Sequence, residues 1–183
     1  MQIETKNLTL LPHAPAHLRA LITGADAYER SFGHRAGPGL RDFIVSKEVS
    51  PEYLAKLGDS TAPDHWAHGF AVVHRVDRSV IGMAGFKSPP GTDGVVEIAY
   101  GIVPDYQGKG YATEAARALV AFAFNDSRVR LVIAHTLPEH NASTTVLTKC
   151  GFERTGEIVD PHDGLVWRWE KLPERSDGAM IGG

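Results

Sequence analysis

The chain is organised around one glycine-rich turn, the sequence QGKGYA at residues 107–112. A run with strand character precedes it over residues 95–103, and Pro104 ends that run. Apolar side chains then recur with a period of about 3.6, which predicts a helix; they are Ala112, Ala115, Ala116, Leu119, Phe122 and Ala123. We therefore expect a strand, a tight turn, and a helix that starts in the turn and buries its apolar stripe against a sheet.

The strand before the turn has two unlike faces. Bulky side chains alternate on one face, at Val96, Ile98, Tyr100 and Ile102. The other face carries Glu97 together with the small residues Ala99 and Gly101. The first face can pack on a core, and the second is typical of a strand that borders a cleft.

The turn itself has the features of an anion site. Gly108 and Gly110 place no Cβ between the backbone and a ligand. A helix that begins at this point directs its unpaired N–H groups toward whatever lies in the turn. Strand, glycine turn and helix N-terminus together predict an anion site, most often for phosphate.

Two common nucleotide motifs fit the turn poorly. A P-loop needs Ser or Thr after its Gly-Lys pair, but Gly110 follows Lys109, and Val103 stands where the first glycine is required. The GxGxxG fingerprint starts at Gly108 but ends on Thr113, and no acidic residue follows about 20 residues later. An ordinary structural turn and a less common phosphate ligand both remain open at this point.

Gln107, Gly110 and Ala112 fill the pattern Gln/Arg-x-x-Gly-x-Gly/Ala. This pattern resembles the pyrophosphate-binding motif of the GNAT superfamily of N-acetyltransferases, and EIAYGIVPDYQGKGYATEA resembles their central strand, turn and helix. The resemblance implies an α+β (mixed α/β) fold, with a mixed, mostly antiparallel sheet flanked by helices and acetyl-CoA in a cleft at the central strand. It assigns acetyl-CoA binding to Ile102, Val103, Gln107, Gly108, Lys109, Gly110, Tyr111, Ala112 and Thr113.

A second stretch, PEHNASTTVLTKCGF at residues 138–152, resembles the RimJ/RimL-like ribosomal-protein N-acetyltransferase branch of that superfamily. The matching residues are Ser143, Val146, Leu147, Lys149, Gly151 and Phe152. His140 stands where many members have Asn, and Asn141 follows one residue later. Asn141 is therefore a candidate for hydrogen bonding to the pantetheine arm, and it is also a candidate helix cap.

The resemblance implies that an amine attacks the acetyl thioester directly. Glu97 is the candidate base, acting directly or through water, because an alkylamine with a pKa of about 10 must lose a proton. A structural role for Glu97 also remains open. Many relatives place a tyrosine where this chain has Leu147, so the resemblance assigns the leaving thiolate to Ser143. The acceptor is a protein N-terminus or a small-molecule amine, and the alternative function is a non-catalytic acyl-CoA-binding module.

Composition bounds the remaining function classes. The chain has 183 residues, 43% of them apolar, and a net charge of −3, which favours one domain over residues 1–172 with a polar, disordered tail over 173–183. No basic stripe indicates nucleic-acid binding, and no apolar run or leader indicates a membrane or export, so we expect a cytoplasmic protein. The resemblance is also compatible with a homodimer.

Two candidate reactive groups have simpler interpretations. The only cysteine, Cys150, excludes an intrachain disulfide and is expected to be a small buried residue. Asp64, His65 and His68 are too few for a structural zinc site, so we expect a solvated loop there and no metal.

The other elements follow from periodicity and turn residues. Strands are expected over residues 3–11 and 128–136, in a hairpin of 69–75 with 80–87, and in a final hairpin of 152–159 with 165–172. Helices are expected over residues 14–22, 25–32 and 142–150, and one more should start at Pro51 with Ser50 as its cap.

Overall fold

The computed structural model describes residues 1–45, 55 and 57–175. The helix expected from Pro51 starts outside these residues. Most of the tail expected to be disordered also lies outside them. Within the described ranges the strands are β1 (Ile3–Glu4), β2 (Leu8–Pro12), β3 (Arg35–Ala36), β4 (Phe70–His74), β5 (Ser79–Phe86), β6 (Val95–Ile102), β7 (Leu131–Thr136), β8 (Glu153–Asp160) and β9 (Gly164–Lys171). The α-helices are α1 (Pro15–Thr23), α2 (Ala25–Phe32), α4 (His65–His68), α5 (Tyr111–Phe124) and α6 (Ala142–Lys149), with 3-10 turns η1 (Leu40–Phe43) and η2 (Pro104–Tyr106).

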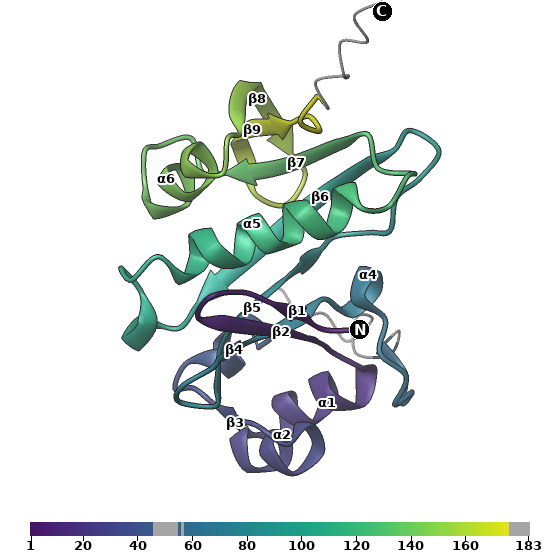
Figure 1. The fold of residues 1–183 in the computed structure, drawn as a ribbon, viewed down its shortest axis with the longest axis vertical. Coiled ribbons are helices and arrows are strands. Elements are labelled where there is room, and N and C mark those ends of the chain that lie inside the picture. The colour runs from purple at the N-terminus through teal and green to yellow at the C-terminus, as the bar shows by residue number, and fades with distance from the viewer. Residues whose placement is uncertain (46–54, 56, 176–183) are drawn as a thin grey trace, which may run out of the picture.

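The strands form one sheet in the order β1-β2-β4-β5-β6-β7-β9-β8, with β3 beside β5 (Figure 1). Its strand pairs are antiparallel except for β3 with β5 and β6 with β7. The mixed, mostly antiparallel sheet and its flanking helices confirm the predicted α+β fold class.

The sheet opens between its two central strands. β6 pairs with β7 only over Val95 to Glu97, whereas on its other edge it pairs with β5 as far as Ile102. β7 meanwhile continues to pair with β9 through Thr136. Figure 1 shows the two ribbons moving apart beyond their short paired segment. One edge of β6 is therefore left without a strand partner over Ile98 to Ile102, among the residues described.

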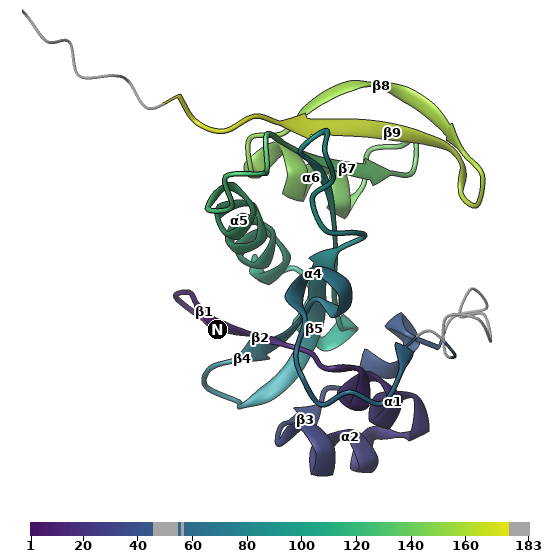
Figure 2. The ribbon, with the colours of Figure 1, turned by 90° about the vertical axis from the view of Figure 1, so that its right-hand side faces the viewer.

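Helix α5 packs along one side of the sheet beside this opening (Figure 2). Its buried stripe consists of Ala115, Ala116, Leu119 and Ala123, none of which has exposed surface. Alanines bring the helix axis close to the strands, as the predicted apolar repeat requires. Helix α6 contacts α5 through the hydrogen bond that the Arg117 guanidinium donates to the Lys149 carbonyl. Cys150, at the end of α6, is buried, and burial raises the pKa of its thiol, which agrees with the expected structural role.

Three expected elements were wrong in part. The first strand is two strands, because Thr5 N–H donates to the Leu8 carbonyl and turns the chain between them. The loop expected at DHWAHGF contains helix α4, because the Asp64 carboxylate accepts from the amides of Trp66 and Ala67. The strand expected from residue 128 starts at Leu131.

A long-range contact fixes the first turn against α5. The Glu114 carboxylate accepts hydrogen bonds from Thr5 Oγ1 (2.6 Å), Asn7 N–H (2.7 Å) and Asn7 Nδ2 (2.9 Å). Burial raises the pKa of Glu114, but these hydrogen bonds outweigh it and hold the pKa below its ordinary value of 4.5. The N-terminal hairpin is thereby tied to the helix that begins at the glycine turn.

Replacing Glu114 with Ala tests this contact. The partly exposed carboxylate should contribute about 1 to 2 kcal/mol to the free energy of unfolding at pH 7, so the variant should unfold about 2 to 8 °C lower. Because the pKa is depressed in the folded state, the contribution is present above pH 4.5 and is lost as the pH falls through the folded value below it. The unfolding temperatures of the wild type and of Glu114→Ala should therefore converge in acid.

The control is Glu29→Ala, on the exposed surface of α2. A gap between wild type and Glu114→Ala that persists unchanged in acid, or that Glu29→Ala reproduces, would show that the carboxylate does not tie the two segments together.

Candidate functional site

The glycine turn is open on the side where side chains would project. Gly108 and Gly110 have positive φ angles of 73° and 85°, which L side chains rarely adopt. A Cβ placed on either residue meets no protein atom within 4 Å. Gly110 is the N-cap of α5, so the free amides of the first helical turn lie at the same place. The geometry leaves room for a ligand against bare backbone, as the sequence predicted.

Neighbouring side chains hold the turn in place. Gln107 Nε2 donates to the Ile102 carbonyl at 2.9 Å, which ties the turn to the end of β6. Lys109 Nζ donates to the Asp105 carbonyl at 3.2 Å and lies 5.2 Å from the centre of the Tyr106 ring. Lys109 is therefore folded back onto the loop, while its charge remains beside the turn.

A cavity of about 430 Å³ extends from this turn between β6 and α6. Of the residues predicted to bind acetyl-CoA or to act on it, the wall contains Ile102, Gln107, Gly108, Gly110, Tyr111, Ala112, Thr113 and Ser143. Val103, Lys109, Asn141 and Glu97 are not part of that wall. Val103 is fully buried. Its N–H donates a hydrogen bond to the Ile81 carbonyl, and its carbonyl accepts one from the Tyr106 N–H.

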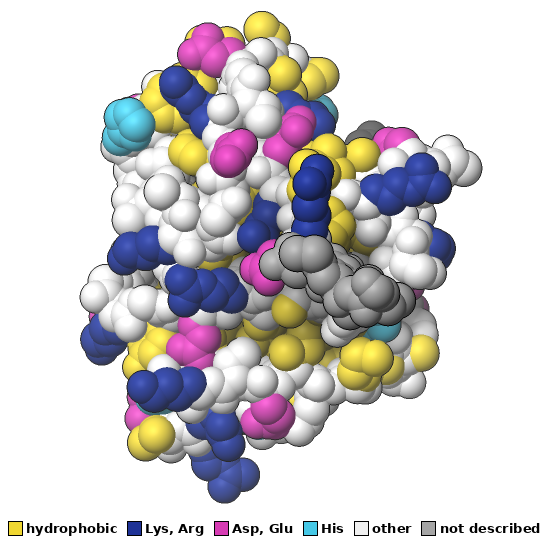
Figure 3. All heavy atoms as spheres, turned by 45° about the horizontal axis from the view of Figure 1, so that its top comes forward, with side chains coloured by type: hydrophobic (Ala, Val, Ile, Leu, Met, Phe, Trp, Pro, Cys, Tyr) yellow, Lys and Arg dark blue, Asp and Glu magenta, His cyan; other side chains and the backbone are white. Residues whose placement is uncertain are grey.

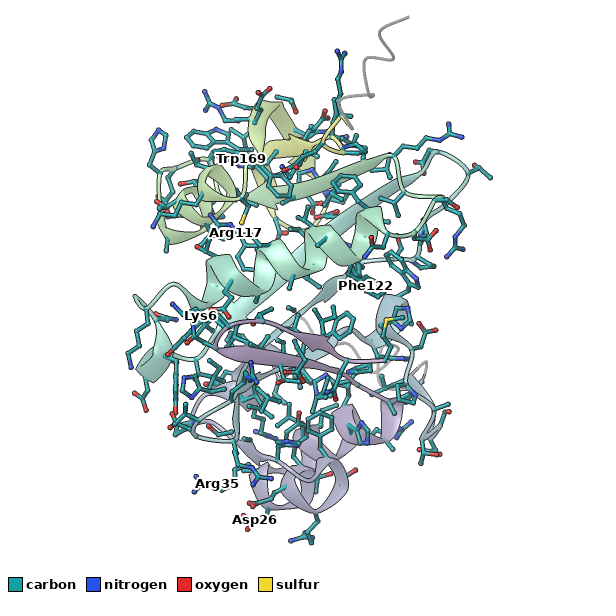
Figure 4. The ribbon with its side chains drawn as sticks, viewed as in Figure 1. Lys6, Asp26, Arg35, Arg117, Phe122 and Trp169 are labelled. Atoms are coloured by element: carbon teal, nitrogen blue, oxygen red, sulfur yellow. The ribbon has the colours of Figure 1, made fainter. Side chains whose placement is uncertain are left out.

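A larger groove adjoins the same turn. It has a volume of about 910 Å³, lies between the N-terminal hairpin and α5, and shares Gly110, Thr113 and Lys149 with the first cavity. Lys6 and Arg117 also line it (Figure 4). Figure 3 shows Lys and Arg side chains at several places on the visible face, with Asp and Glu side chains among them. With Lys149, the basic side chains of the groove outnumber its two acidic ones, Glu4 and Glu114, so the groove has a small excess of positive charge next to the predicted anion site.

Ser143 lies beside Tyr100 within the first cavity. The Tyr100 hydroxyl is 3.4 Å from both Ser143 Oγ and the Ser143 carbonyl oxygen. Burial raises the pKa of Tyr100 to about 12, so it stays protonated at neutral pH. Sequence reasoning placed Tyr100 only on the core face. The signal it passed over was a hydroxyl on an otherwise aliphatic face, because a buried tyrosine hydroxyl usually has a partner.

Asn141 is the N-cap of α6. Its Oδ1 accepts from the Thr144 amide at 3.1 Å, and its own amide donates to Thr144 Oγ1 at 3.0 Å. The helix-cap interpretation is thus confirmed, and a contact with pantetheine stays a prediction. The His140 ring lies against Trp167, with ring centroids 5.1 Å apart.

Glu97 belongs to a charged cluster on the face of β6 that also carries the small residues Ala99 and Gly101. Its Oε1 is 2.6 Å from Lys87 Nζ and 2.9 Å from His135 Nδ1. A carboxylate accepts hydrogen bonds, so Nδ1 is the donor in this contact. His135 Nε2 is buried without a partner in the described part of the chain. Sequence reasoning missed Lys87 and His135, because their contact depends on the register of strands far apart in sequence.

A second cavity of about 420 Å³ lies on the face that carries Glu97. Ala99, Gly101 and Lys87 line it. It shares Tyr100 and Gly101 with the first cavity, so the two spaces meet across β6, at the point where β6 has left β7.

The family model for the acetyltransferase (GNAT) domain matches residues 7–153, which include the opened strands, the glycine turn and α6. The chain belongs to the GNAT acetyltransferase family. The GNAT fold accounts for the mixed, mostly antiparallel sheet and its flanking helices.

Individual relatives agree with this membership. The uncharacterized N-acetyltransferase YnaD of Bacillus subtilis (strain 168) is 36% identical over 90 residues, which cover 49% of this chain and 52% of that protein. Aminoglycoside N(6')-acetyltransferase type 1 of Klebsiella pneumoniae is 26% identical over 142 residues, 74% of this chain and 67% of that protein. The chain spans 52% to 64% of the length of the first Bacillus relatives that it matches.

A solved structure shows the same fold. RimL, a ribosomal alpha-N-protein acetyltransferase in complex with coenzyme A, superposes with a TM-score of 0.66 at 14% identity, over 94% of this chain and 98% of that one. In the residues described here, no helix combines the length and apolar character that a membrane span requires. No group of three or more His, Cys, Asp or Glu side chains is placed to hold a metal within those same residues.

Proposed function

We propose that this GNAT protein transfers the acetyl group of acetyl-CoA directly to a primary amine. One observation carries the proposal: two cavities on opposite faces of β6 share Tyr100 and Gly101. One cavity begins at the open glycine turn, and the other lies on the face that carries Glu97. A thioester in the first and an amine in the second would meet at this strand.

The turn fits the pyrophosphate of acetyl-CoA. The bare backbone from Gly108 to Thr113 offers N–H groups at the start of α5, and no protein atom fills the space in front of Gly108 or Gly110. The free edge of β6 over Ile98 to Ile102 offers main-chain groups to the pantetheine arm. Arg117 and Lys149, in the adjoining groove, offer positive charge to the phosphate of acetyl-CoA that is not part of the pyrophosphate.

The reaction balances with groups of this chain alone. The amine nitrogen attacks the thioester carbonyl carbon, and the main-chain N–H of Ile102, on the free edge of β6, polarises the carbonyl oxygen. The C–S bond then breaks, and the amine's proton passes to Glu97 directly or through water. The departing thiolate, whose thiol has a pKa of about 8.5, accepts a hydrogen bond from Ser143 supported by Tyr100.

Lys87 adds an electrostatic effect on the acceptor. Its ammonium group lines the second cavity and lies 2.6 Å from the Glu97 carboxylate. Glu97 offsets part of this positive charge, and the part that remains disfavours the ammonium form of a nearby amine. Glu97 can exchange its contact with Lys87 for one with the acceptor and take the proton released on attack.

The alternative is a GNAT domain that binds acyl-CoA without catalysis. The Glu97 carboxylate, on the same face of β6 as Ala99 and Gly101 of the second cavity, favours catalysis, because a binding module has no use for a base on the acceptor face. Turnover with an amine distinguishes the two functions directly.

A comparison of two turn variants tests the mode of acetyl-CoA binding. Gly110→Val should weaken binding by a factor of about 100 or more, because a branched side chain opposes positive φ and fills the space in front of the amides. Lys109→Ala should weaken it by less than about tenfold, because that point charge is exposed to solvent. Titration calorimetry with acetyl-CoA measures both. Equal losses would contradict binding by the backbone.

Glu97→Gln tests the proposed base. Without general-base catalysis the rate of thiol release at saturating substrates should fall by a factor of about 100 to 10,000, while the dissociation constant for acetyl-CoA stays the same. Glu153→Gln, on the exposed edge strand β8, is the control. Full turnover by Glu97→Gln would remove Glu97 as the base, and absence of turnover by the wild type with any amine would favour the binding module.

A further inference from the structure

The second cavity has a chemistry of its own, and from it we infer the acceptor class. We propose that it takes a small primary monoamine with an aromatic or aliphatic body, and that it discriminates against polycationic amines. This inference rests on the proposed acetyl transfer and adds the identity of the acceptor to it.

The wall of the cavity is largely apolar. Two large apolar side chains line it on the face that carries Glu97, Phe43 of η1 and Met83 of β5. Phe70 and Phe86 also border it, with their rings buried against Phe122. Its volume of about 420 Å³ falls within the range of about 300 to 1,000 Å³ that is usual for small-molecule sites. An aromatic or aliphatic body would bury its apolar surface here at about 25 cal/mol per Å².

The charges in the wall are of the wrong sign for a polycation. No carboxylate lines the cavity among the described residues, and its titratable side chains other than Tyr100 are Lys87, His13 and His68. Burial, with smaller contributions from His17 and His68, lowers the pKa of His13 to about 3, so His13 is neutral. Glu97, nearby on the strand, is already paired with Lys87 and His135. A second or third ammonium group on the acceptor would enter without an anionic partner.

Phe43 covers the strand at the reacting end of the cavity. A Cβ added to Gly101 would lie only 2.9 Å from Phe43 Cε1, so the ring rests directly on the bare backbone of β6. The ring is nevertheless 42% exposed, which leaves apolar surface free at the cavity. An aromatic acceptor would pack against this ring and place its amine toward Gly101 and Glu97.

The proposal separates this chain from one of its relatives. The matched Klebsiella protein is an aminoglycoside acetyltransferase, and an aminoglycoside carries several ammonium groups. The described wall of this cavity offers no acidic side chain to such an acceptor, and the carboxylate nearby, Glu97, is paired with Lys87.

Thiol release from acetyl-CoA, measured with a panel of amines, tests the inference. The monoamines are 2-phenylethylamine and hexylamine, and the polycations are spermidine and kanamycin. We expect kcat/KM to be at least about tenfold higher for the monoamines. A thermal-unfolding scan with acetyl-CoA alone accompanies the panel and reports on the cofactor site independently.

The outcomes are distinct. Faster turnover of the monoamines supports the inference. A thermal shift with acetyl-CoA combined with equal or faster turnover of the polycations overturns the acceptor class and leaves acetyl transfer intact, and a shift without turnover of either monoamine also overturns the acceptor class. Absence of any shift removes the proposed function itself, and the acceptor class with it.

Phe43→Ala locates the specificity in this cavity. We expect KM for 2-phenylethylamine to rise by about five- to tenfold, with kcat and the affinity for acetyl-CoA little changed, and Phe43→Leu to restore part of the loss. Leu165→Ala removes a side chain of similar exposure, 46% against 42%, that lies outside both cavities. An unchanged KM in Phe43→Ala would contradict packing of the acceptor on this ring.

Discussion

The separation of β6 from β7 is the constraint on which the site depends. The two strands exchange backbone hydrogen bonds only as far as Glu97, and β6 then continues with β5 while β7 continues with β9. Unpaired main-chain groups away from water are costly, so an exposed strand edge in the middle of a sheet requires a partner. In the proposed complex that partner is the pantetheine arm of acetyl-CoA, which lies where a neighbouring strand would otherwise pair.

Several small residues keep this opening usable from both faces. A Cβ on Gly82 would lie 2.2 Å from the Gly101 carbonyl oxygen, so β5 and β6 approach closely only because Gly82 has no side chain. Ala99 and Gly101 have little or no side chain, so they leave space on the face of β6 that carries Glu97. The alanine stripe of α5 brings the start of the helix, with its free amides, to the end of the same strand. Glu114 then fixes that helix to the N-terminal hairpin. Packing and the proposed catalysis therefore rely on the same short segment.

Local pattern was sufficient to predict the central strand, the glycine turn, α5 and the direction in which Glu97 points. Each of these follows from residues within a few positions of one another. The missing parts depend on contacts between distant residues. Glu114, 109 residues from Thr5, holds the turn that divides the first strand in two, and Lys87 and His135 meet Glu97 only through strand register. Asp64 could have been recognised locally, because its carboxylate caps a helix in a segment that was assigned to a loop.

Hydrogen–deuterium exchange with and without acetyl-CoA tests the central claim most directly. Amides of Ile98 to Ile102 that do not donate to β5, together with those of residues 108–113, should exchange at least about tenfold more slowly in the complex. Amides of the β8–β9 hairpin, on the far edge of the sheet, should be unaffected. Protection of the turn and the free edge of β6 together would support acetyl-CoA as the missing partner of that strand. Protection confined to other parts of the chain, or unchanged exchange along β6, would contradict the account.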